Sequence, residues 1–262
     1  MTAGSAAVVD LAGHVIIVTG GGAGIGAVYA SHLAAAGAHV AVADLDEQGA
    51  RRVAEEVRRN GGSAFAVAVD VADEASTVRM AAEVLAAHGR IDGLVNNAAL
   101  MSTLPRRAWH EIPVDEWDRV MAVNLRGMFL CCRAVYPAMR EAGRGRIVNI
   151  SSNRVWDGTP NRLHYTSSKA GVIGFTRSLA REVGADGITV NAITPGYTES
   201  ETQVAGSTEE YRQRMEALNA RKCIARTQVP GDLVGTVAFL LSDAAAFITG
   251  QTINVDGGFA MH

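Results

Sequence analysis

The sequence predicts an α/β protein built on a doubly wound, seven-stranded parallel sheet with helices on both faces. Two observations carry this prediction. Short apolar runs alternate with longer helical patterns along all 262 residues. The short runs are apolar along most of their length, so both faces of the sheet must be covered. No linker, repeat or low-complexity tract interrupts the pattern, and residues 1–262 are therefore expected to form one domain.

The first half of the chain gives the clearest elements. HVIIVTG (14–20) reads as a strand that ends in glycine, and a small-residue helix at 24–36 stops at Gly37. Further strands are predicted on the apolar runs at 39–44, 64–70 and 93–99. The segments between them, 46–60 and 73–88, carry helical patterns.

The second half repeats this alternation. A long helix is predicted near 115–141 and another near 164–184, with strands at 146–152, 188–195 and 251–258. So many strand–helix repeats indicate a Rossmann-type sheet. Residues 198–228 are polar and lack a strand, and we expect them to form a helical lid over a substrate site.

Composition excludes several classes of protein. Hydrophobic residues make up 48% and charged residues 19%, as in a globular domain. The net charge of −3 and the scattered arginines argue against a nucleic-acid partner. No long apolar run or basic leader predicts a membrane span or a signal peptide. Cys131, Cys132 and Cys223 have no metal-ligand spacing, so we expect reduced thiols, a cytoplasmic protein and no metal site.

A glycine-rich turn follows the first predicted strand. VTGGGAGIG (18–26) fits the literal GxGxxG pattern poorly, but TGxxxGxG matches Thr19, Gly20, Gly24 and Gly26. Such a turn lets the backbone approach a pyrophosphate, and the following helix offers free N–H groups and a positive dipole end. A tight turn with no ligand is the alternative.

Two aspartates end the next strands. Asp44 lies near the offset expected of the acidic residue that accepts hydrogen bonds from a ribose, and it would repel a 2′-phosphate. No lysine or arginine lies in the glycine turn, so the sequence favours NAD over NADP. Asp70 could accept from an adenine amino group. The alternatives are a solvated carboxylate for Asp44 and a helix N-cap neighbour for Asp70.

The reacting end of the predicted site lies on the fifth strand and the helix after it. Tyr165 and Lys169 are four residues apart, so they share one face of a helix. Of 24 lysines and arginines, only Lys169 and Lys222 are lysines. An ammonium beside a phenol favours phenolate, and Ser152 would hold a substrate oxygen while Tyr165 exchanges its proton. The alternative is an ordinary amphipathic helix surface.

These motifs together resemble those of the short-chain dehydrogenase/reductases. The matching segments, which span nearly the whole chain, are TGGGAGIG at 19–26, Asp44, DV at 70–71, NNAA at 96–99, VNL at 123–125, NISS at 149–152, YTSSK at 165–169 and NAITPG at 191–196. The chain departs from the family pattern at Ala99, where glycine is usual. It departs again at Thr198 and Ser200, where an aliphatic residue and a threonine are usual.

The resemblance implies functional residues. The expected catalytic residues are Asn124, Ser152, Tyr165 and Lys169, with Asn124 holding a water that links Lys169 to solvent. The expected cofactor contacts are Gly20, Gly24, Ile25, Gly26, Asp44, Leu45, Asp70, Val71, Asn97, Ala98, Tyr165, Lys169, Pro195, Gly196 and Thr198. Asn96 and Ala98 would lie beside the adenosine, and Pro195 and Gly196 would border the nicotinamide.

The substrate is the least determined feature. SNRVWDGTPN (152–161) and residues 229–262 look like those of family members that oxidise aryl carbinols, such as the dehydrogenases of 1-phenylethanol and of pyridoxal. Met101, Asn153, Trp156 and Tyr197 should border the substrate, although packing under the lid explains them equally well. A mostly apolar pocket would suit a small hydrophobic alcohol or ketone.

Other functions and the assembly are also open at this stage. A 3-oxoacyl-carrier-protein reductase is one alternative, which would prefer NADPH and a basic docking patch, and a non-catalytic NAD-binding protein is another. Apolar residues surround much of the helices near 115–141 and 164–184, which indicates pairing of helices between subunits. By resemblance we expect a homotetramer in which the terminal FAMH reaches a neighbour's pocket. His164 reads as a helix-start histidine without a catalytic role.

Overall fold

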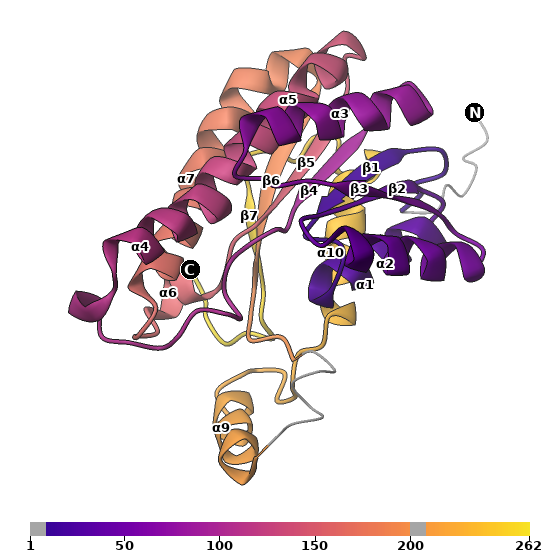
Figure 1. Ribbon diagram of the computed structural model, residues 1–262. Helices are drawn as coiled ribbons and strands as arrows, with labels where there is room; N and C mark the ends of the chain where they lie inside the picture. Colours follow the sequence, from indigo (N-terminus) through magenta and orange to yellow (C-terminus); the bar gives the residue numbers. More distant parts are fainter. Residues whose placement is uncertain (1–8, 200–207) are drawn as a thin grey trace.

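A parallel sheet forms the centre of the molecule. The structure is a computed structural model that describes residues 9–199 and 208–262. Within those residues, seven strands pair in the order β3-β2-β1-β4-β5-β6-β7 (Figure 1). They are β1 Val15–Thr19, β2 His39–Asp44, β3 Ser63–Ala68, β4 Gly93–Asn96, β5 Gly145–Ile150, β6 Ile188–Pro195 and β7 Thr252–Val255. The predicted fold class is confirmed.

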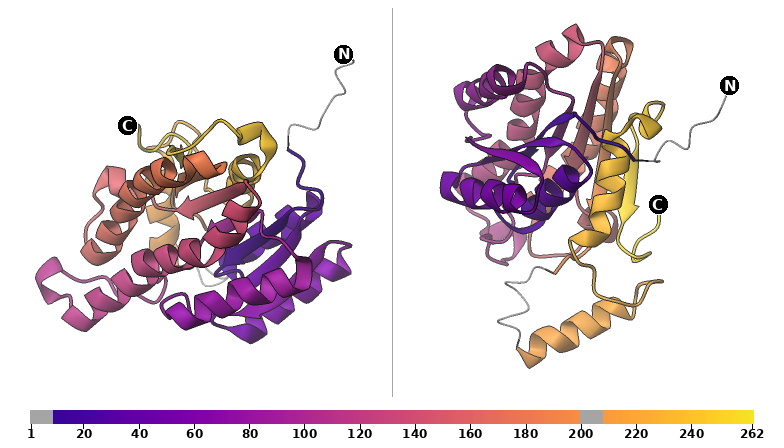
Figure 2. Two further views of the ribbon diagram at one scale, coloured as in Figure 1. Left: turned by 90° about the horizontal axis from the view of Figure 1, so that it is seen from above. Right: turned by 90° about the vertical axis from the view of Figure 1, so that its right-hand side faces the viewer.

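Helices cover both faces of this sheet (Figures 1 and 2). On one face, the core is built by α1 Gly24–Ala35, α2 Glu47–Arg59 and α10 Gly231–Leu241. On the other, it is built by α3 Glu74–His88, α5 Gly127–Glu141 and α7 Leu163–Val183. Successive side chains of β1 alternate between the two cores, with Ile16 and Val18 in the first and Val15 and Ile17 in the second. This explains why the strand is apolar throughout.

The helices differ from the prediction in two places. The helix expected at 115–141 is α4 Val114–Met121 followed by a π-helical turn, Ala122–Arg126, and then α5. Such π turns are frequent at functional positions. The helix α10 was not predicted, since it is apolar nearly all round and shows no amphipathic period. The remaining short elements are Trp109–Glu111, α6 Arg154–Asp157, Gly184–Asp186, α9 Glu209–Asn219 and Asp243–Ala245.

The strands end earlier than the sequence suggests. Pairing of β4 with β5 stops at Asn96, and pairing of β5 with β6 stops at Ile150. Four predicted strands extend two or three residues beyond the ends of the observed strands, namely those at 64–70, 93–99, 146–152 and 251–258. Beyond the end of β5, the Ser151 and Asn153 N–H groups still donate to the Ile193 and Pro195 carbonyls of β6, but the regular strand has ended. The polar residues that follow therefore lie in loops at the carboxyl edge.

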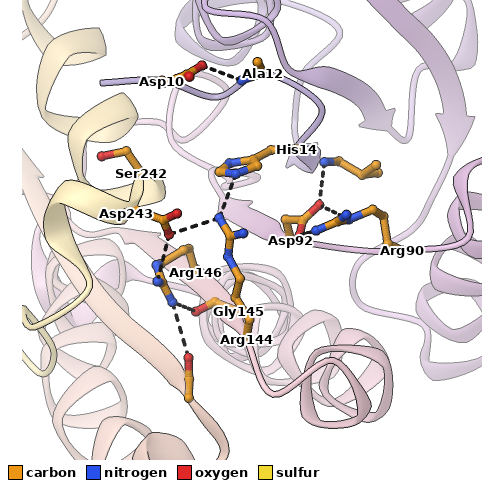
Figure 3. A network of polar contacts seen from close by, with 12 residues as sticks. Asp10, Ala12, His14, Arg90, Asp92, Arg144, Gly145, Arg146, Ser242 and Asp243 are labelled. Atoms are coloured by element: carbon orange, nitrogen blue, oxygen red, sulfur yellow. Dashed lines mark hydrogen bonds and ion pairs between the residues drawn. The ribbon is translucent and has the colours of Figure 1, made fainter. Parts of the chain in front are cut away.

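The amino edge of the sheet carries a network of charges (Figure 3). Arg144, just before β5, contacts His14 Nε2 at 2.7 Å and Asp243 at 3.1 Å. Arg146 reaches the same Asp243 oxygen at 3.3 Å. Asp92, before β4, accepts a hydrogen bond of 2.9 Å from the first N–H of β1. The starts of three strands are thereby tied to one another and to the segment after α10.

Membrane and metal features can be checked against the described parts of the chain. There, no helix combines the length and the apolar character needed to cross a bilayer. The same residues hold no group of three side chains suited to binding a metal ion. Cys131 and Cys132 are buried in α5 and Cys223 is exposed, all as free thiols.

Candidate active site

A cleft of about 490 Å³ opens at the carboxyl ends of β1 to β4. The chain runs outward from β1 to β3 and then returns to β4, so the strand order reverses beside β1. Such a reversal point is where open α/β sheets bind ligands. The cleft is lined by most residues predicted to contact a cofactor, namely Gly20, Gly24, Ile25, Gly26, Asp44, Leu45, Asp70, Val71, Asn97, Ala98 and Thr198.

The glycine turn has a backbone that residues with a side chain rarely adopt. Gly20 and Gly24 have φ of +63° and +55°, in the left-handed region. A Cβ on Gly26 would lie 2.0 Å from the Gly20 carbonyl oxygen. Asn97 Nδ2 donates to the carbonyls of Thr19 and Gly20 at 3.0 and 3.1 Å, which fixes the turn from the β4 side. No side chain caps the start of α1, so its first N–H groups face the cleft for an anion.

Asp44 lies at the rim of this cleft. Its Oδ2 accepts from the Gly22 N–H at 2.8 Å and its Oδ1 from the Asp46 N–H at 2.9 Å. No lysine or arginine is among the described residues that line the cleft. Asp70 also lines it, and the N-cap of α3 is Asp73, whose carboxylate accepts from Ala75 and Ser76. Both predicted carboxylates thus face the cleft.

A second cavity, of about 230 Å³, adjoins the cleft and shares Ile25, Asn97 and Thr198 with it. The predicted reacting residues that line it are Ser152, Tyr165, Lys169, Pro195 and Gly196. Ser152 follows β5, and the next two lie on α7, which packs against the same strands. The fold therefore brings the predicted serine, tyrosine and lysine into one cavity.

The Tyr165 phenol is buried, with 7% of the residue exposed. Burial raises its pKa above the ordinary value, while the hydrogen bond with Ser152 and the charges of Arg154 and Arg162 act in the opposite direction. From the sequence we expected a neighbouring ammonium to lower this pKa. In the protein alone the net shift of the Tyr165 pKa is upward, because desolvation of the phenol outweighs the favourable contacts.

Lys169 is buried as well, at 3% exposure. Its Nζ donates to the Ile150 carbonyl at 2.7 Å and lies 5.9 Å from the centre of the Tyr165 ring. No carboxylate of the described residues forms an ion pair with it. Burial lowers its pKa to about 8. The amine is thus poised to gain or lose a proton near neutral pH.

Asn124 occupies the π-helical turn between α4 and α5. Its Oδ1 accepts from the Leu100 N–H at 2.7 Å, and its Nδ2 donates to the Leu100 carbonyl and to Ser168 Oγ at 3.2 and 3.1 Å. A separate cavity of about 10 Å³ is lined by both Asn124 and Lys169. Asn124 therefore shares this small cavity with Lys169 and does not line the larger cavity that contains Ser152.

Two expected contacts lie elsewhere. Asn96 points into the sheet interior, where its Nδ2 donates to Asn149 Oδ1 at 2.9 Å, so it does not line the cleft as Asn97 does. Trp156 stacks on His262 with ring centres 3.9 Å apart and does not line the cavity. Successive residues after a strand point to opposite sides, and the motif alone does not say which side faces the ligand.

The cavity wall is mostly apolar, as expected, and it also carries charged side chains that the sequence did not place there. Met101, Asn153 and Tyr197 line it as predicted. The sequence reading missed further lining residues, namely Arg154, Asp157, Thr159, Leu218, Lys222 and Phe259. One signal was available, because Lys222 is one of only two lysines in the chain.

The expected lid is described in part. Its residues 200–207, which include Ser200, lie outside the described residues. Helix α9 stands apart from the two helical layers, on the side of the carboxyl edge (Figures 1 and 2). Leu218 at its end and Lys222 after it line the cavity.

The chain is similar to known oxidoreductases over nearly its whole length. A family model described as Enoyl-(Acyl carrier protein) reductase matches residues 20–260. The chain is 39% identical over 254 residues to a 3-oxoacyl-[acyl-carrier-protein] reductase of Synechocystis sp., covering 96% of this chain and 98% of that protein.

Solved structures agree with this similarity. A putative short-chain alcohol dehydrogenase from Sinorhizobium meliloti 1021 superposes with a TM-score of 0.89 at 35% identity, over 97% of this chain and 100% of that one. A putative NAD(P)-dependent gluconate 5-dehydrogenase from Beutenbergia cavernae, with bound NADP, gives a TM-score of 0.87 at 40% identity, over 95% and 98% of the two chains.

Proposed function

Because the chain belongs to the short-chain dehydrogenase/reductase family of oxidoreductases, we propose that it transfers a hydride between NAD(H) and a small alcohol or ketone. One observation carries the proposal. Ser152, Tyr165 and Lys169 line a single cavity that adjoins the cleft at the glycine turn. A protein that only binds a dinucleotide needs no proton-transferring group beside it.

The cleft residues fit a dinucleotide. The Gly20–Gly26 turn leaves no room for a Cβ at Gly26, and the uncapped start of α1 suits a pyrophosphate. Asp44 would accept from the ribose hydroxyls of the adenosine half. Pro195, Gly196 and Thr198 would border the nicotinamide, which supplies the hydride or accepts it when bound.

The cavity residues would handle the proton. The Ser152 hydroxyl holds the substrate oxygen, and the Tyr165 hydroxyl exchanges a proton with that oxygen. Lys169, with a pKa of about 8, favours the phenolate in its charged form. The small cavity between Lys169 and Asn124 is about 10 Å³, close to the space of one water molecule, which supports a proton path to solvent through Asn124.

We also propose NAD as the preferred cofactor. Asp44 is the support, because its carboxylate lies where a 2′-phosphate would be repelled and no cation lines the cleft within the described residues. The putative NAD(P)-dependent protein from Beutenbergia cavernae holds NADP at low occupancy, so the proposal of NAD rests on Asp44 and on the absence of a cation from the described cleft lining.

For the substrate we propose a small hydrophobic alcohol of the aryl-carbinol kind. Met101, Tyr197 and Phe259 offer apolar surface around the reacting groups. The polar wall at Arg154, Asp157 and Lys222 would favour a substrate that also carries a polar group.

A 3-oxoacyl-carrier-protein reductase is the second candidate, and the Synechocystis relative favours it. That activity needs a basic surface for the acidic carrier. Arg106, Arg107 and Arg126 are the arginines that the sequence offers for such a surface. The Glu116 carboxylate, 3.4 Å from Arg107, offsets one of these charges, whereas Arg126 donates to the neutral Ala72 carbonyl at 3.3 Å and keeps its charge.

A substrate panel tests the proposal. Aryl alcohols, aliphatic alcohols, sterols and acyl thioesters are each tested with NAD(H) and with NADP(H), and nicotinamide absorbance is followed. We expect turnover with NAD and an aryl or aliphatic alcohol. Turnover only with NADPH and an acyl thioester would select the second candidate. Tight NADH binding without any turnover would support a non-catalytic binding protein.

We propose a homotetramer as the assembly. Val114 in α4, Phe129 in α5 and Leu163 in α7 are exposed apolar residues on neighbouring helices, and Phe129 meets Phe175 edge to face at 6.5 Å. An exposed apolar face on such helices suits pairing with a second copy. Sedimentation equilibrium would give four chains per particle, and a monomer would contradict the proposal.

A further inference from the structure

A buried cluster of ionisable side chains lies behind Tyr165, where α4 packs on the first turn of α7. His164 is wholly buried, and its Nε2 lies 3.2 Å from Glu116 Oε1. Arg107 Nη2 contacts the other Glu116 oxygen at 3.4 Å. None of the three lines the cleft or the cavity. These three side chains therefore do not bind substrate or cofactor directly.

The charged groups around His164 determine its protonation state. Glu116 faces it from α4, Arg107 from the preceding loop and Arg162 from the start of α7. Burial and the two arginines lower the pKa of His164 more than Glu116 raises it. The ring is thus neutral near pH 7. His164 Nε2 and Glu116 Oε1 lie within hydrogen-bond distance, but their orientation in this structure does not make the bond, and neither buried atom has another hydrogen-bond partner among the described residues.

The same region anchors the loop that borders the site. Arg162 donates to Met101 Sδ at 2.8 Å and to the Leu104 carbonyl at 3.0 Å. Leu104 packs with Tyr165 and Val120 in a small buried cluster. Met101 lines both the cleft and the cavity. The turn that carries Tyr165 and the loop that carries Met101 are thus held against α4 by neighbouring contacts.

We propose that Glu116 and His164 are positioning residues for Tyr165. A proton on Nε2 would turn their 3.2 Å contact into a hydrogen bond that holds the first turn of α7 against α4, and the phenol hydroxyl would thereby stay beside Ser152. Tyr165 directly follows His164, so a shift of the ring of His164 moves the reacting group. A displacement of about 1 Å at a reacting group can cost on the order of 100-fold in rate. The inference rests on the proposed oxidoreductase function, in which Tyr165 transfers the proton.

Two variants at position 164 test whether the place of the hydrogen-bond donor matters, or only the polarity of the side chain. In His164→Gln the amide nitrogen can donate from the place of Nε2, whereas in His164→Asn the shorter amide reaches only the place of Nδ1. The matched control is His110→Asn, since His110 is exposed and lies on the neighbouring Trp109–Glu111 turn. The readouts are kcat, the Kd for NADH by fluorescence, and hydrogen exchange of the peptide covering 162–169.

We expect His164→Asn to lose about tenfold in kcat, with faster exchange across 162–169 and an NADH Kd within about twofold of the wild type. His164→Gln should recover most of the kcat and the slow exchange, and His110→Asn should match the wild type. Equal kcat and exchange in the Asn and Gln variants would overturn the proposal, as would loss of NADH binding in step with kcat.

The proposed function and this inference can fail separately. If the wild type turns over no alcohol or ketone, the proposed function fails, while hydrogen exchange in the two variants still decides whether the pair holds the turn. If His164→Asn does not fold, Glu116→Gln replaces it, because the amide keeps an acceptor for His164. It should then behave as the Gln variant does, and a tenfold loss of kcat in it would overturn the hydrogen-bond account.

Discussion

The two edges of the sheet use ionisable side chains in opposite ways. At the amino edge, Arg144 and Arg146 share Asp243, and Arg90 pairs with Asp92 (Figure 3). At the carboxyl edge, Asp44 and Lys169 bond only to backbone groups, and no ion pair joins either to a described residue.

The paired charges of the amino edge contribute to stability, whereas the unpaired groups of the carboxyl edge serve function. Paired charges at strand starts offset each other's desolvation and hold the strands in register. Unpaired ionisable groups that face a cavity gain their partner only when a ligand arrives, which is why such groups mark functional sites. Changes at the amino edge should therefore alter stability and spare activity, and changes at the carboxyl edge should do the reverse.

The largest effect should come from Tyr165→Phe. Loss of the hydroxyl removes the proton path, so kcat should fall by about 100-fold or more. The Kd for NADH should stay within about threefold, because the ring and its packing remain. Stopped-flow turnover and NADH fluorescence measure the two quantities. Parallel loss of both would show that the residue holds the cofactor and does not transfer the proton.

The next largest effect should come from Asp92→Ala at the opposite edge. The carboxylate is buried at 5% exposure, accepts from the first N–H of β1 and is bonded by Arg90. Its removal should lower the free energy of unfolding by about 2–4 kcal/mol, with kcat unchanged at 25 °C. Urea unfolding with Glu83→Ala, an exposed carboxylate on α3, as the control measures this. A lower kcat in the folded variant would show that the amino edge affects activity as well as stability.

A smaller effect is expected from Asp44→Ala. Removing the carboxylate takes away both the ribose contact and the repulsion of a 2′-phosphate. The ratio of kcat/KM with NAD to that with NADP should fall by about tenfold, while the melting temperature changes little. An unchanged ratio in steady-state kinetics would show that another group selects the cofactor.

The smallest effect concerns pH and His14. Burial and Arg144 lower the pKa of His14 below its ordinary value of 6.5. The lowered pKa means that its stabilising contribution is present above about pH 6.5 and is lost as the pH falls through the lower folded-state value. Melting curves should show a drop below pH 6.5 that is smaller in His14→Asn, and identical curves for the two proteins would contradict this.

Much of the fold could be predicted because it depends on local pattern. Apolar runs gave the strands, and TGxxxGxG gave the turn before α1. The ends of β3, β4 and β5 could not be predicted, since they depend on pairing with strands from other parts of the chain. The helix α10 was missed because residues buried on several sides carry no amphipathic period.

The site follows the same rule. Tyr165 and Lys169 share a helix face, so spacing alone predicts their proximity. Spacing does not predict that Asn96 faces the interior and Asn97 the cleft, nor that Phe259 and Lys222 complete the cavity from distant segments. The contact of His164 with Glu116 also joins separate helices, so neither local sequence predicts it.

Isotope transfer tests the central claim most directly. NADH with deuterium in both positions at C4 of the nicotinamide is mixed with a ketone from the active class, and the alcohol product is examined by mass spectrometry. The account predicts one deuterium on the carbinol carbon with the wild type and almost no product with Tyr165→Phe. Product formed without deuterium, or equal product from both proteins, would contradict it.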